Sequence, residues 1–186
     1  GMAGAIAEAE RLNRSIPGSV ILGQFSNPAN PEAHVLSTAQ EIWEDTDGQV
    51  DILVATVGTG GTLCGTARGL KTYNPQLISI AVEPQESPLL SGGTASPHGI
   101  QGIGANFIPE NYDPTVVDRI MQVSTEQAMQ TGRELSRHEG LITGISSGAA
   151  VHAALTYALT PEAKGKTIVV VLPDTGERYL STELYG

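Results

Sequence analysis

The sequence predicts an α/β fold in which a mostly parallel sheet is covered by helices on both faces. Stretches rich in Val, Ile and Leu alternate along the chain with stretches of helical periodicity. The apolar stretches are nearly continuous, which is typical of parallel strands buried on both faces. With 186 residues, the chain is long enough for one domain, or for one domain and part of a second.

Each element of this fold has its own signal in the sequence. Pro17-Gly18 ends an alanine-rich helix, and Asn30-Pro31-Glu32 is typical of a helix start. Helices are expected over residues 3–14, 30–43, 62–73 and 125–138, and from about residue 146 onward. Strands are expected over residues 19–25, 50–57, 77–83, 119–124 and 167–173. Residues 84–115 are rich in Gly, Pro and Ser, and a loop of that length in a compact domain is usually functional or mobile.

Composition excludes several functional classes. The net charge of −10 argues against a nucleic-acid backbone as the main ligand. No apolar stretch approaches the ~18 residues of a membrane span, and the first residues lack the pattern of a signal peptide. The single cysteine excludes an internal disulfide, and the four histidines show no metal-ligand spacing. We therefore expect a cytoplasmic protein without a metal site.

The segment VGTGGT, which ends at Thr62, follows a predicted buried strand and precedes a predicted helix. Backbone N–H groups in such a turn point to one spot, and the helix dipole adds partial positive charge there. The segment therefore predicts an anion site, while a ligand-free turn is the alternative. A nucleoside-triphosphate loop would need a lysine that is absent here. The dinucleotide pattern would need a glycine where Leu63 stands, although Glu83 resembles the ribose-binding acid of that pattern.

Three further segments carry candidate site residues. Ser146 stands at a predicted helix start, where it is either an N-cap or a hydroxyl that faces a ligand. Gly102 and Gly104 lie in the long loop, which is either a flexible surface loop or a lid over a substrate. The amide of Gln24 is either a carboxylate ligand or a group that stabilises a turn.

Seven segments together resemble, in the same order, O-acetylserine sulfhydrylase, or cysteine synthase, a pyridoxal-phosphate enzyme of fold type II. These segments are QFSNPANP, EIWEDTDGQVD, VGTGGTLCG, VEP, IQGIGANFIP, GISSGAA and GERYLST. The resemblance covers nearly the whole chain and implies the carboxyl-terminal portion of the enzyme. It also implies that residues 1–30 are part of a small α/β domain and that residues 31–186 form the large domain that binds the cofactor phosphate.

The resemblance implies a role for each candidate residue. The cofactor phosphate would be bound by Gly58, Thr59, Gly60, Gly61 and Thr62. Ser146 would hydrogen-bond to the pyridine nitrogen of pyridoxal 5'-phosphate, and a neutral hydroxyl does not hold a proton on that nitrogen as a carboxylate would. Gln24, Gly102 and Gly104 would bind the substrate. The implied reaction replaces the acetate of O-acetylserine by sulfide and yields L-cysteine, in a homodimer that binds the C-terminal tail of serine acetyltransferase.

The chain departs from the family in lacking the Schiff-base lysine. Its only lysines are Lys71, Lys164 and Lys166, and none stands in a matching motif. Because that amine normally takes the substrate's α-proton, we expect no catalytic residue in this chain and no activity of the chain alone. A non-catalytic fragment or decoy that binds the serine acetyltransferase tail is the alternative. A cystathionine β-synthase-like enzyme and an NAD-dependent enzyme fit the motifs less well.

Overall fold

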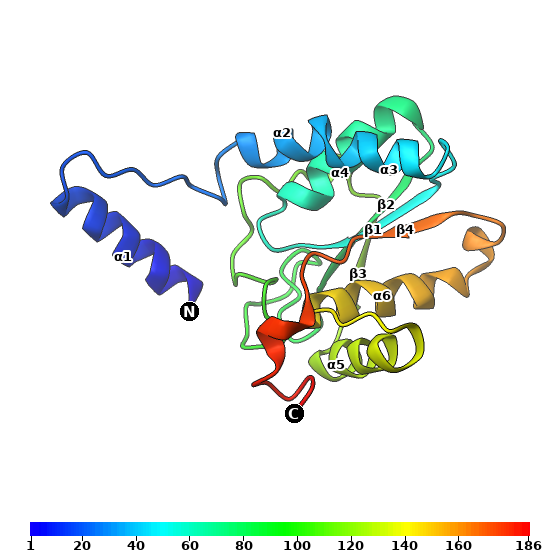
Figure 1. The fold of residues 1–186 in the computed structure, drawn as a ribbon. Helices are drawn as coiled ribbons and strands as arrows, with labels where there is room; N and C mark the ends of the chain where they lie inside the picture. Colours follow the sequence, from blue (N-terminus) through cyan, green and yellow to red (C-terminus); the bar gives the residue numbers. More distant parts are fainter.

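The computed structural model describes residues 1–186 and contains one sheet of four parallel strands (Figure 1). The strand order is β3-β2-β1-β4, and every neighbouring pair is parallel. The strands are β1 (Ile52–Thr56), β2 (Ile78–Pro84), β3 (Arg119–Val123) and β4 (Ile168–Val170). The prediction of a mostly parallel α/β sheet is therefore confirmed.

Six α-helices accompany the sheet. They are α1 (Met2–Ser15), α2 (Ala29–Leu36), α3 (Thr38–Asp45), α4 (Gly61–Tyr73), α5 (Thr125–Glu134) and α6 (Ile145–Ala158). Short 3-10 helices cover Pro114–Val116, Pro161–Ala163 and Gly176–Tyr179, and a π-helical turn covers Leu135–Glu139. No helix combines the length and the apolar character needed to cross a membrane.

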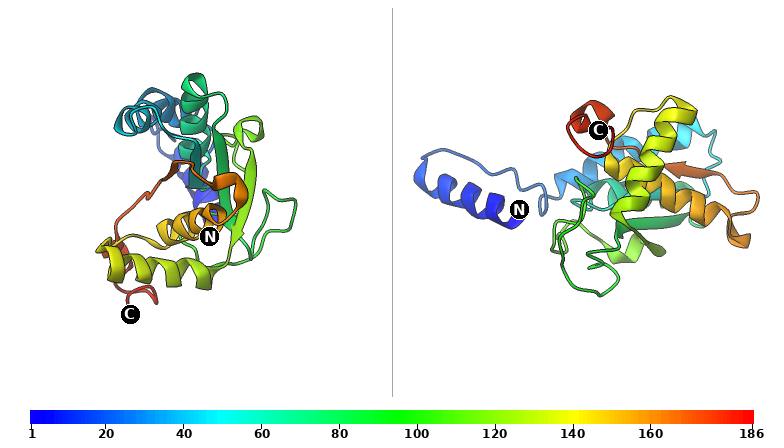
Figure 2. Two further views of the ribbon diagram at one scale, coloured as in Figure 1. Left: turned by 90° about the vertical axis from the view of Figure 1, so that its right-hand side faces the viewer. Right: turned by 90° about the horizontal axis from the view of Figure 1, so that it is seen from below.

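The two faces of the sheet are covered by different helices, as Figures 1 and 2 show. Alternate residues of β1 point to opposite faces, so Ile52 and Val54 join one buried cluster while Leu53 and Ala55 join the other. The first cluster packs against α5 and α6, and the second packs against α3 and α4. Because all four residues are fully or almost fully buried, β1 reads in the sequence as an uninterrupted apolar stretch.

Two predicted elements differ in kind from the structure, and the strand expected over residues 167–173 is shorter, Ile168–Val170. The helix expected over residues 30–43 is two helices, because the chain leaves helical geometry at Ser37, with φ −120° and ψ −70°. The strand expected over residues 19–25 does not form, since no other strand of the chain lies beside it. Val20 and Leu22 in that segment are both 80% exposed, so neither the pairing nor the burial that stabilises a strand is available.

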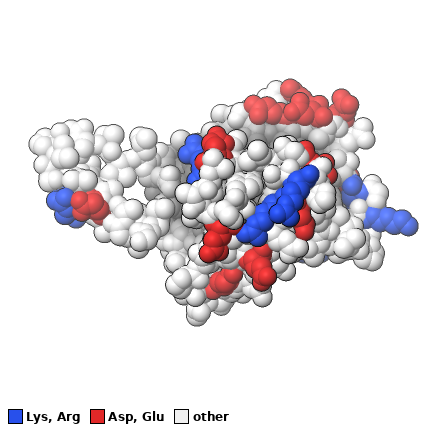
Figure 3. Space-filling model, turned by 60° about the horizontal axis from the view of Figure 1, so that its bottom comes forward, with Lys and Arg blue, Asp and Glu red and all other residues white.

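Helix α1 projects away from the sheet at the end of an extended segment (Figure 2). It contains no buried residue, although its apolar residues follow helical spacing. On the face shown in Figure 3 this projection is largely uncharged, with one group of acidic and basic side chains. Residues 1–28 therefore form an arm beside the α/β body, and the division into domains at residue 30 remains a prediction.

The strand order places a topological switch point beside β1. The connection from β1 through α4 leads to β2 on one side, whereas β4 lies on the other side. In open parallel sheets, ligands bind in the crevice at the carboxyl ends of the strands where the connections diverge. The loops that follow β1 and β4 both begin at this edge of the sheet.

Candidate functional site: an anion cradle at the carboxyl edge of the sheet

The loop after β1 presents backbone donors that have no acceptor within the protein. The N–H groups of Gly58, Thr59 and Gly60 make no hydrogen bond in the structure. Gly60 is the N-cap of α4, adopts φ 85°, and leaves the first turn of that helix without a side-chain cap. Free N–H groups at a helix start, together with the helix dipole, form an anion site.

Two side chains of α2 contact the hydroxyl groups of this loop. Asn30 Nδ2 donates to Thr59 Oγ1 at 2.9 Å, and His34 Nε2 lies 3.2 Å from Thr62 Oγ1. A Cβ atom on Gly61 would overlap the Asn30 amide, so glycine is required for the close approach of α2 to α4. Helix α2 therefore packs against one side of the loop after β1. The other side of this loop, which faces away from α2, is open.

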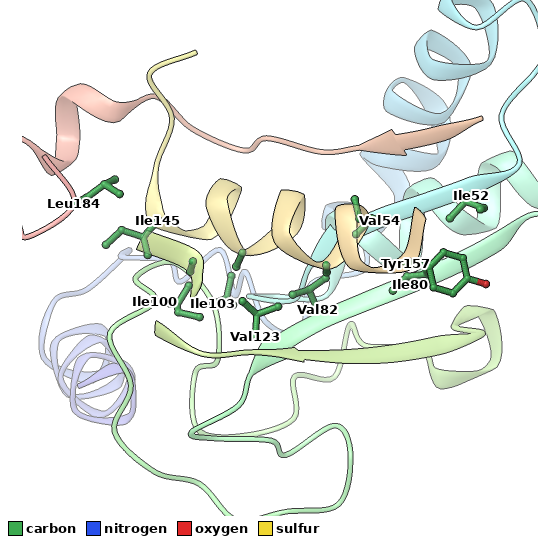
Figure 4. Close-up of a cluster of buried hydrophobic side chains, with 14 of the residues drawn as sticks. Ile52, Val54, Ile80, Val82, Ile100, Ile103, Val123, Ile145, Tyr157 and Leu184 are labelled. Carbon is green, nitrogen blue, oxygen red and sulfur yellow. The ribbon is translucent and has the colours of Figure 1, made fainter. Parts of the chain in front are cut away.

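The loop of residues 98–106 covers the end of β1. The Gly104 N–H donates to the Val57 carbonyl at 3.2 Å, and a Cβ atom on Gly58 would come within 2.5 Å of the Gly102 carbonyl oxygen. Figure 4 shows Ile100 and Ile103 in the buried cluster beside Ile145 and Val123. These two isoleucines anchor the loop of residues 98–106, which we call the glycine loop. Its Gly102 and Gly104 lie directly against residues 58–62, which we call the cradle.

His98 holds the same loop from its far side. Its Nε2 atom lies 2.8 Å from the Gly104 carbonyl oxygen, which can only accept a hydrogen bond, so Nε2 carries the proton. Its Nδ1 atom is buried and has no partner. Gly104 adopts φ 58°, and a Cβ atom there would collide with both His98 and Pro84.

Ser146 lies at the start of α6, close to Gly102. The residue is 2% exposed, and its hydroxyl makes no hydrogen bond within the protein. The N-cap of α6 is Gly144, and no side chain caps that helix, so the interpretation of Ser146 as an N-cap is wrong. A Cβ atom on Gly102 would lie 3.8 Å from Ser146 Oγ, which places the serine at the rim of the glycine loop.

The loop after β4 packs beside this helix start. The Tyr179 hydroxyl donates to Asp174 Oδ2 at 2.5 Å, and burial together with this carboxylate raises the pKa of Tyr179 to about 12. The Gly144 N–H donates to the Asp174 carbonyl at 3.4 Å. Asp174 therefore connects the carboxyl end of β4 to the start of α6.

A hollow of about 330 Å³ brings five of the nine predicted site residues together, whereas Gly60, Gly61, Thr62 and Ser146 do not line it. It is lined by Gln24, Gly58, Thr59, Gly102 and Gly104, among others. Gln24 is held through its backbone, because its carbonyl accepts from Asn30 Nδ2 at 2.8 Å and from Asn111 Nδ2 at 2.9 Å. Its exposed side chain makes no hydrogen bond within the protein, so it is available to a ligand.

The three lysines lie at the opposite edge of the sheet. Lys71 Nζ is 2.7 Å from an Asp118 carboxylate oxygen just before β3, and Lys166 Nζ is 3.0 Å from Asp51 just before β1. Lys164 is exposed in the turn that leads into β4. No amine of a lysine therefore reaches the cradle from within this chain.

The donor set suits a phosphate monoester attached to an aromatic ring. The unpaired N–H groups and the two threonine hydroxyls can bind phosphate oxygens without a cationic side chain. The hydroxyl of Ser146, which has no partner within the protein, can hydrogen-bond to a ring nitrogen, because a hydroxyl both donates and accepts. Both features lie at the carboxyl edge of the sheet, and Gly102 lies close to each of them.

Sequence reasoning missed four residues that hold the site: Asn30, His34, His98 and Asn111. Asn30 and His34 carried a usable signal, because a spacing of four residues on a predicted helix places them on one face. Asn111 carried none, since it contacts Gln24 across 87 residues of sequence.

The comparisons with known proteins agree with this geometry. Residues 1–174 match the family described as pyridoxal-phosphate dependent enzyme. Cysteine synthase A of Escherichia coli strain K12 is 52% identical over 195 aligned positions, which cover 100% of this chain and 60% of that protein.

Solved structures give the same result. Cysteine synthase from Entamoeba histolytica has a TM-score of 0.95 and 50% identity, covering 100% of this chain and 55% of that one. An O-acetylserine dependent cystathionine beta-synthase from Helicobacter pylori has a TM-score of 0.93 and 40% identity, covering 100% and 60% of the respective chains.

The chain thus spans about 60% of the length of the curated relatives that it matches. These shares of length do not support the expectation that the matched part is the carboxyl-terminal portion of the enzyme, and we do not retain that placement.

Proposed function

Because the chain belongs to the family of pyridoxal-phosphate dependent enzymes, we propose that it is the cofactor-binding part of a cysteine synthase. The proposed reaction replaces the acetate of O-acetylserine by sulfide and yields L-cysteine. The observation that supports it most is the set of unpaired N–H donors at Gly58, Thr59 and Gly60, together with the Ser146 hydroxyl beside Gly102. The identity of 52% to a cysteine synthase favours this reaction over others of the family.

Different residues of this chain would bind the phosphate, the ring and the amino-acid substrate. The loop from Gly58 to Thr62 would bind the phosphate, and Ser146 would hydrogen-bond to the ring nitrogen. Bound pyridoxal phosphate supplies an electron sink for the substrate carbanion. Gln24, Gly102 and Gly104 would bind the amino-acid substrate in the hollow that they line, and closure of the loop over it would exclude water.

The chain by itself should be inactive, because no lysine amine lies at the cradle. Its three lysines pair with carboxylates or lie in a turn at the amino-terminal edge of the sheet. The α-proton of the substrate therefore has no lysine to accept it here.

A chimera tests the proposed function directly. This chain would replace the matched segment of Escherichia coli cysteine synthase A, and product would be measured with O-acetylserine and either sulfide or homocysteine. We expect cysteine from sulfide, and no product from the isolated chain. A folded, cofactor-loaded chimera that forms cystathionine but no cysteine would instead support the cystathionine β-synthase alternative, in line with the Helicobacter pylori structure.

The finer assignments belong to the same proposal. We expect the complete protein to be a cytoplasmic homodimer that binds the C-terminal tail of serine acetyltransferase. The hollow beside Gln24 also favours a second candidate, a decoy that binds such a tail without catalysis, because it lacks a lysine but keeps an unengaged amide. Binding of a peptide carboxylate to the isolated chain, measured by calorimetry, would separate a binding module from an inert fragment.

A further inference from the structure

Two side chains on one face of α2 contact the two threonine hydroxyls of the cradle. Asn30 and His34 are four residues apart, so both point from α2 toward the start of α4. The helices are close, because a Cβ atom on Gly65 would collide with the Pro31 carbonyl and with His34. This close packing leaves the two polar side chains directly behind Thr59 and Thr62.

The orientation of the Asn30 amide follows from its partners. Asn30 Nδ2 lies 2.8 Å from the Gln24 carbonyl oxygen, which can only accept, so this atom is the amide nitrogen. Its second hydrogen points to Thr59 Oγ1 at 2.9 Å. The Gly61 N–H also donates to Thr59 Oγ1, at 3.3 Å. Thr59 Oγ1 therefore accepts from two donors, and its own proton is free to be donated elsewhere.

The ring of His34 bridges two threonines. Nδ1 lies 2.9 Å from Thr38 Oγ1, and Nε2 lies 3.2 Å from Thr62 Oγ1. Burial lowers the pKa of His34, so the neutral ring with one donor and one acceptor is favoured. Each threonine hydroxyl has the ring of His34 as its only partner in the protein, so the ring accepts from one of them and donates to the other. We assign the ring proton to Nε2, the tautomer in which Thr38 donates to Nδ1 and the Thr62 proton stays free for an anion.

We propose that Asn30 and His34 are positioning residues, which direct the hydroxyl protons of both Thr59 and Thr62 away from α2 and toward a bound phosphate. Each threonine oxygen accepts from α2, so each hydroxyl must donate on its open side. With the opposite tautomer of His34, Thr62 would donate to Nε2 and would present only lone pairs to the anion. The inference rests on the proposed function for its ligand, but the tautomer of His34 can be measured without one.

The first experiment reads the tautomer by nitrogen NMR of histidine side chains in the ligand-free wild-type chain. We expect His34 to carry its proton on Nε2 with Nδ1 unprotonated at neutral pH. Protonation on Nδ1 alone would overturn the assignment for Thr62. His152, whose Nδ1 lies 3.2 Å from Thr131 Oγ1 on the far side of the sheet, is a matched histidine–threonine pair for comparison.

The second experiment measures affinity for 4-deoxypyridoxine 5'-phosphate, which has no aldehyde to react with surface lysines, and for 4-deoxypyridoxine without phosphate. We expect His34→Ala to weaken the phosphate compound about tenfold, the loss typical of a hydrogen bond to a charged group, and to leave the other compound unchanged. His34→Gln should restore most of the affinity, because its amide nitrogen replaces Nε2. His152→Ala should change neither affinity.

A double variant shows whether His34 acts through Thr62. In a Thr62→Val background, His34→Ala should cause no further loss of affinity. An equal tenfold loss in that background, or an equal loss for both compounds, would overturn the proposed role. If the wild-type chain bound neither compound, the proposed function would fail as well, whereas normal binding with an ineffective His34→Ala would contradict only this inference. Circular dichroism of each variant checks that it folds.

Discussion

At the residue scale, several polar groups without internal partners lie at one edge of the sheet. The N–H groups of Gly58, Thr59 and Gly60 and the hydroxyl of Ser146 all lie there. Unpaired N–H groups at a helix start that borders a hollow are positioned to bind an anionic ligand. The composition of VGTGGT was sufficient to predict the cradle, because each glycine allows an approach that a side chain would block.

Gly58→Ala tests that close approach. The new Cβ atom would lie 2.5 Å from the Gly102 carbonyl oxygen, so the glycine loop would have to move away. We expect affinity for 4-deoxypyridoxine 5'-phosphate to fall at least tenfold, roughly the cost of one displaced hydrogen bond to an anion. Gly4→Ala is the control, since nothing lies within 4 Å of its Cβ position and the helix tolerates alanine. Unchanged affinity of Gly58→Ala would show that the loop contact is not needed.

At the scale of elements, the loop of residues 98–106 combines fixed and adaptable parts. Ile100 and Ile103 are buried, whereas Gly102 is exposed and has φ 94°. A loop anchored at two points can shift its glycines without unfolding the core, which suits a segment that closes over a substrate.

His98→Ala should loosen this loop without weakening the cradle. It removes the hydrogen bond to the Gly104 carbonyl, so amide hydrogen exchange should rise several-fold over residues 98–106. In the same variant, hydrogen exchange over residues 58–65 should stay unchanged. The control is His138→Ala, which alters an exposed histidine and should leave exchange unchanged in all segments. Equal acceleration in the core strands would mean that His98 stabilises the whole fold instead.

Most elements could be predicted because their signals are local. The buried strands have continuous apolar stretches, and Ser124 with Gln127 forms the capping box that starts α5. The failures concern elements whose stability depends on distant partners. Residues 19–25 have the composition of a strand, but no strand pairs with them, and the break at Ser37 has no proline or glycine to mark it.

At the scale of the whole molecule, ion pairs at the amino-terminal edge of the sheet connect segments far apart in sequence. The Thr167 N–H and then Lys166 hold the pKa of Asp51 below its usual value. Asp118 accepts from Lys71 and from the Ser79 backbone in a similar way. These contacts join the strands at the edge that carries no site.

Asp51→Asn should therefore flatten the dependence of stability on pH at the acid end. A carboxyl with a lowered pKa in the folded state stabilises the protein above its unfolded pKa of ~3.9, and this contribution is lost as the pH falls through the folded value. We expect a loss of about 0.5–1 kcal/mol at pH 7, as for partly exposed pairs, and no difference near pH ~2. Urea unfolding at both pH values measures it, and an equal loss at both would exclude the ionic explanation.

The arm is the part of the molecule that sequence reasoning describes least. Its helix was predicted correctly, but a helix without buried residues does not reveal what it packs against. The chain spans about 60% of the length of the curated relatives that it matches.

In this chain the lysine amines, which could form a covalent bond to an aldehyde, lie far from the cradle that would bind the ligand. All three amines lie at the amino-terminal edge, whereas the cradle lies at the carboxyl edge. An aldehyde-bearing ligand held in the cradle would therefore dissociate unchanged, and borohydride would fix it only to surface amines elsewhere. Peptide mapping after borohydride treatment would therefore identify only labelled surface lysines. Affinity for the cradle has to be measured by reversible binding. The chain is thus a natural reference state in which the affinity of the cradle can be measured free of the covalent bond.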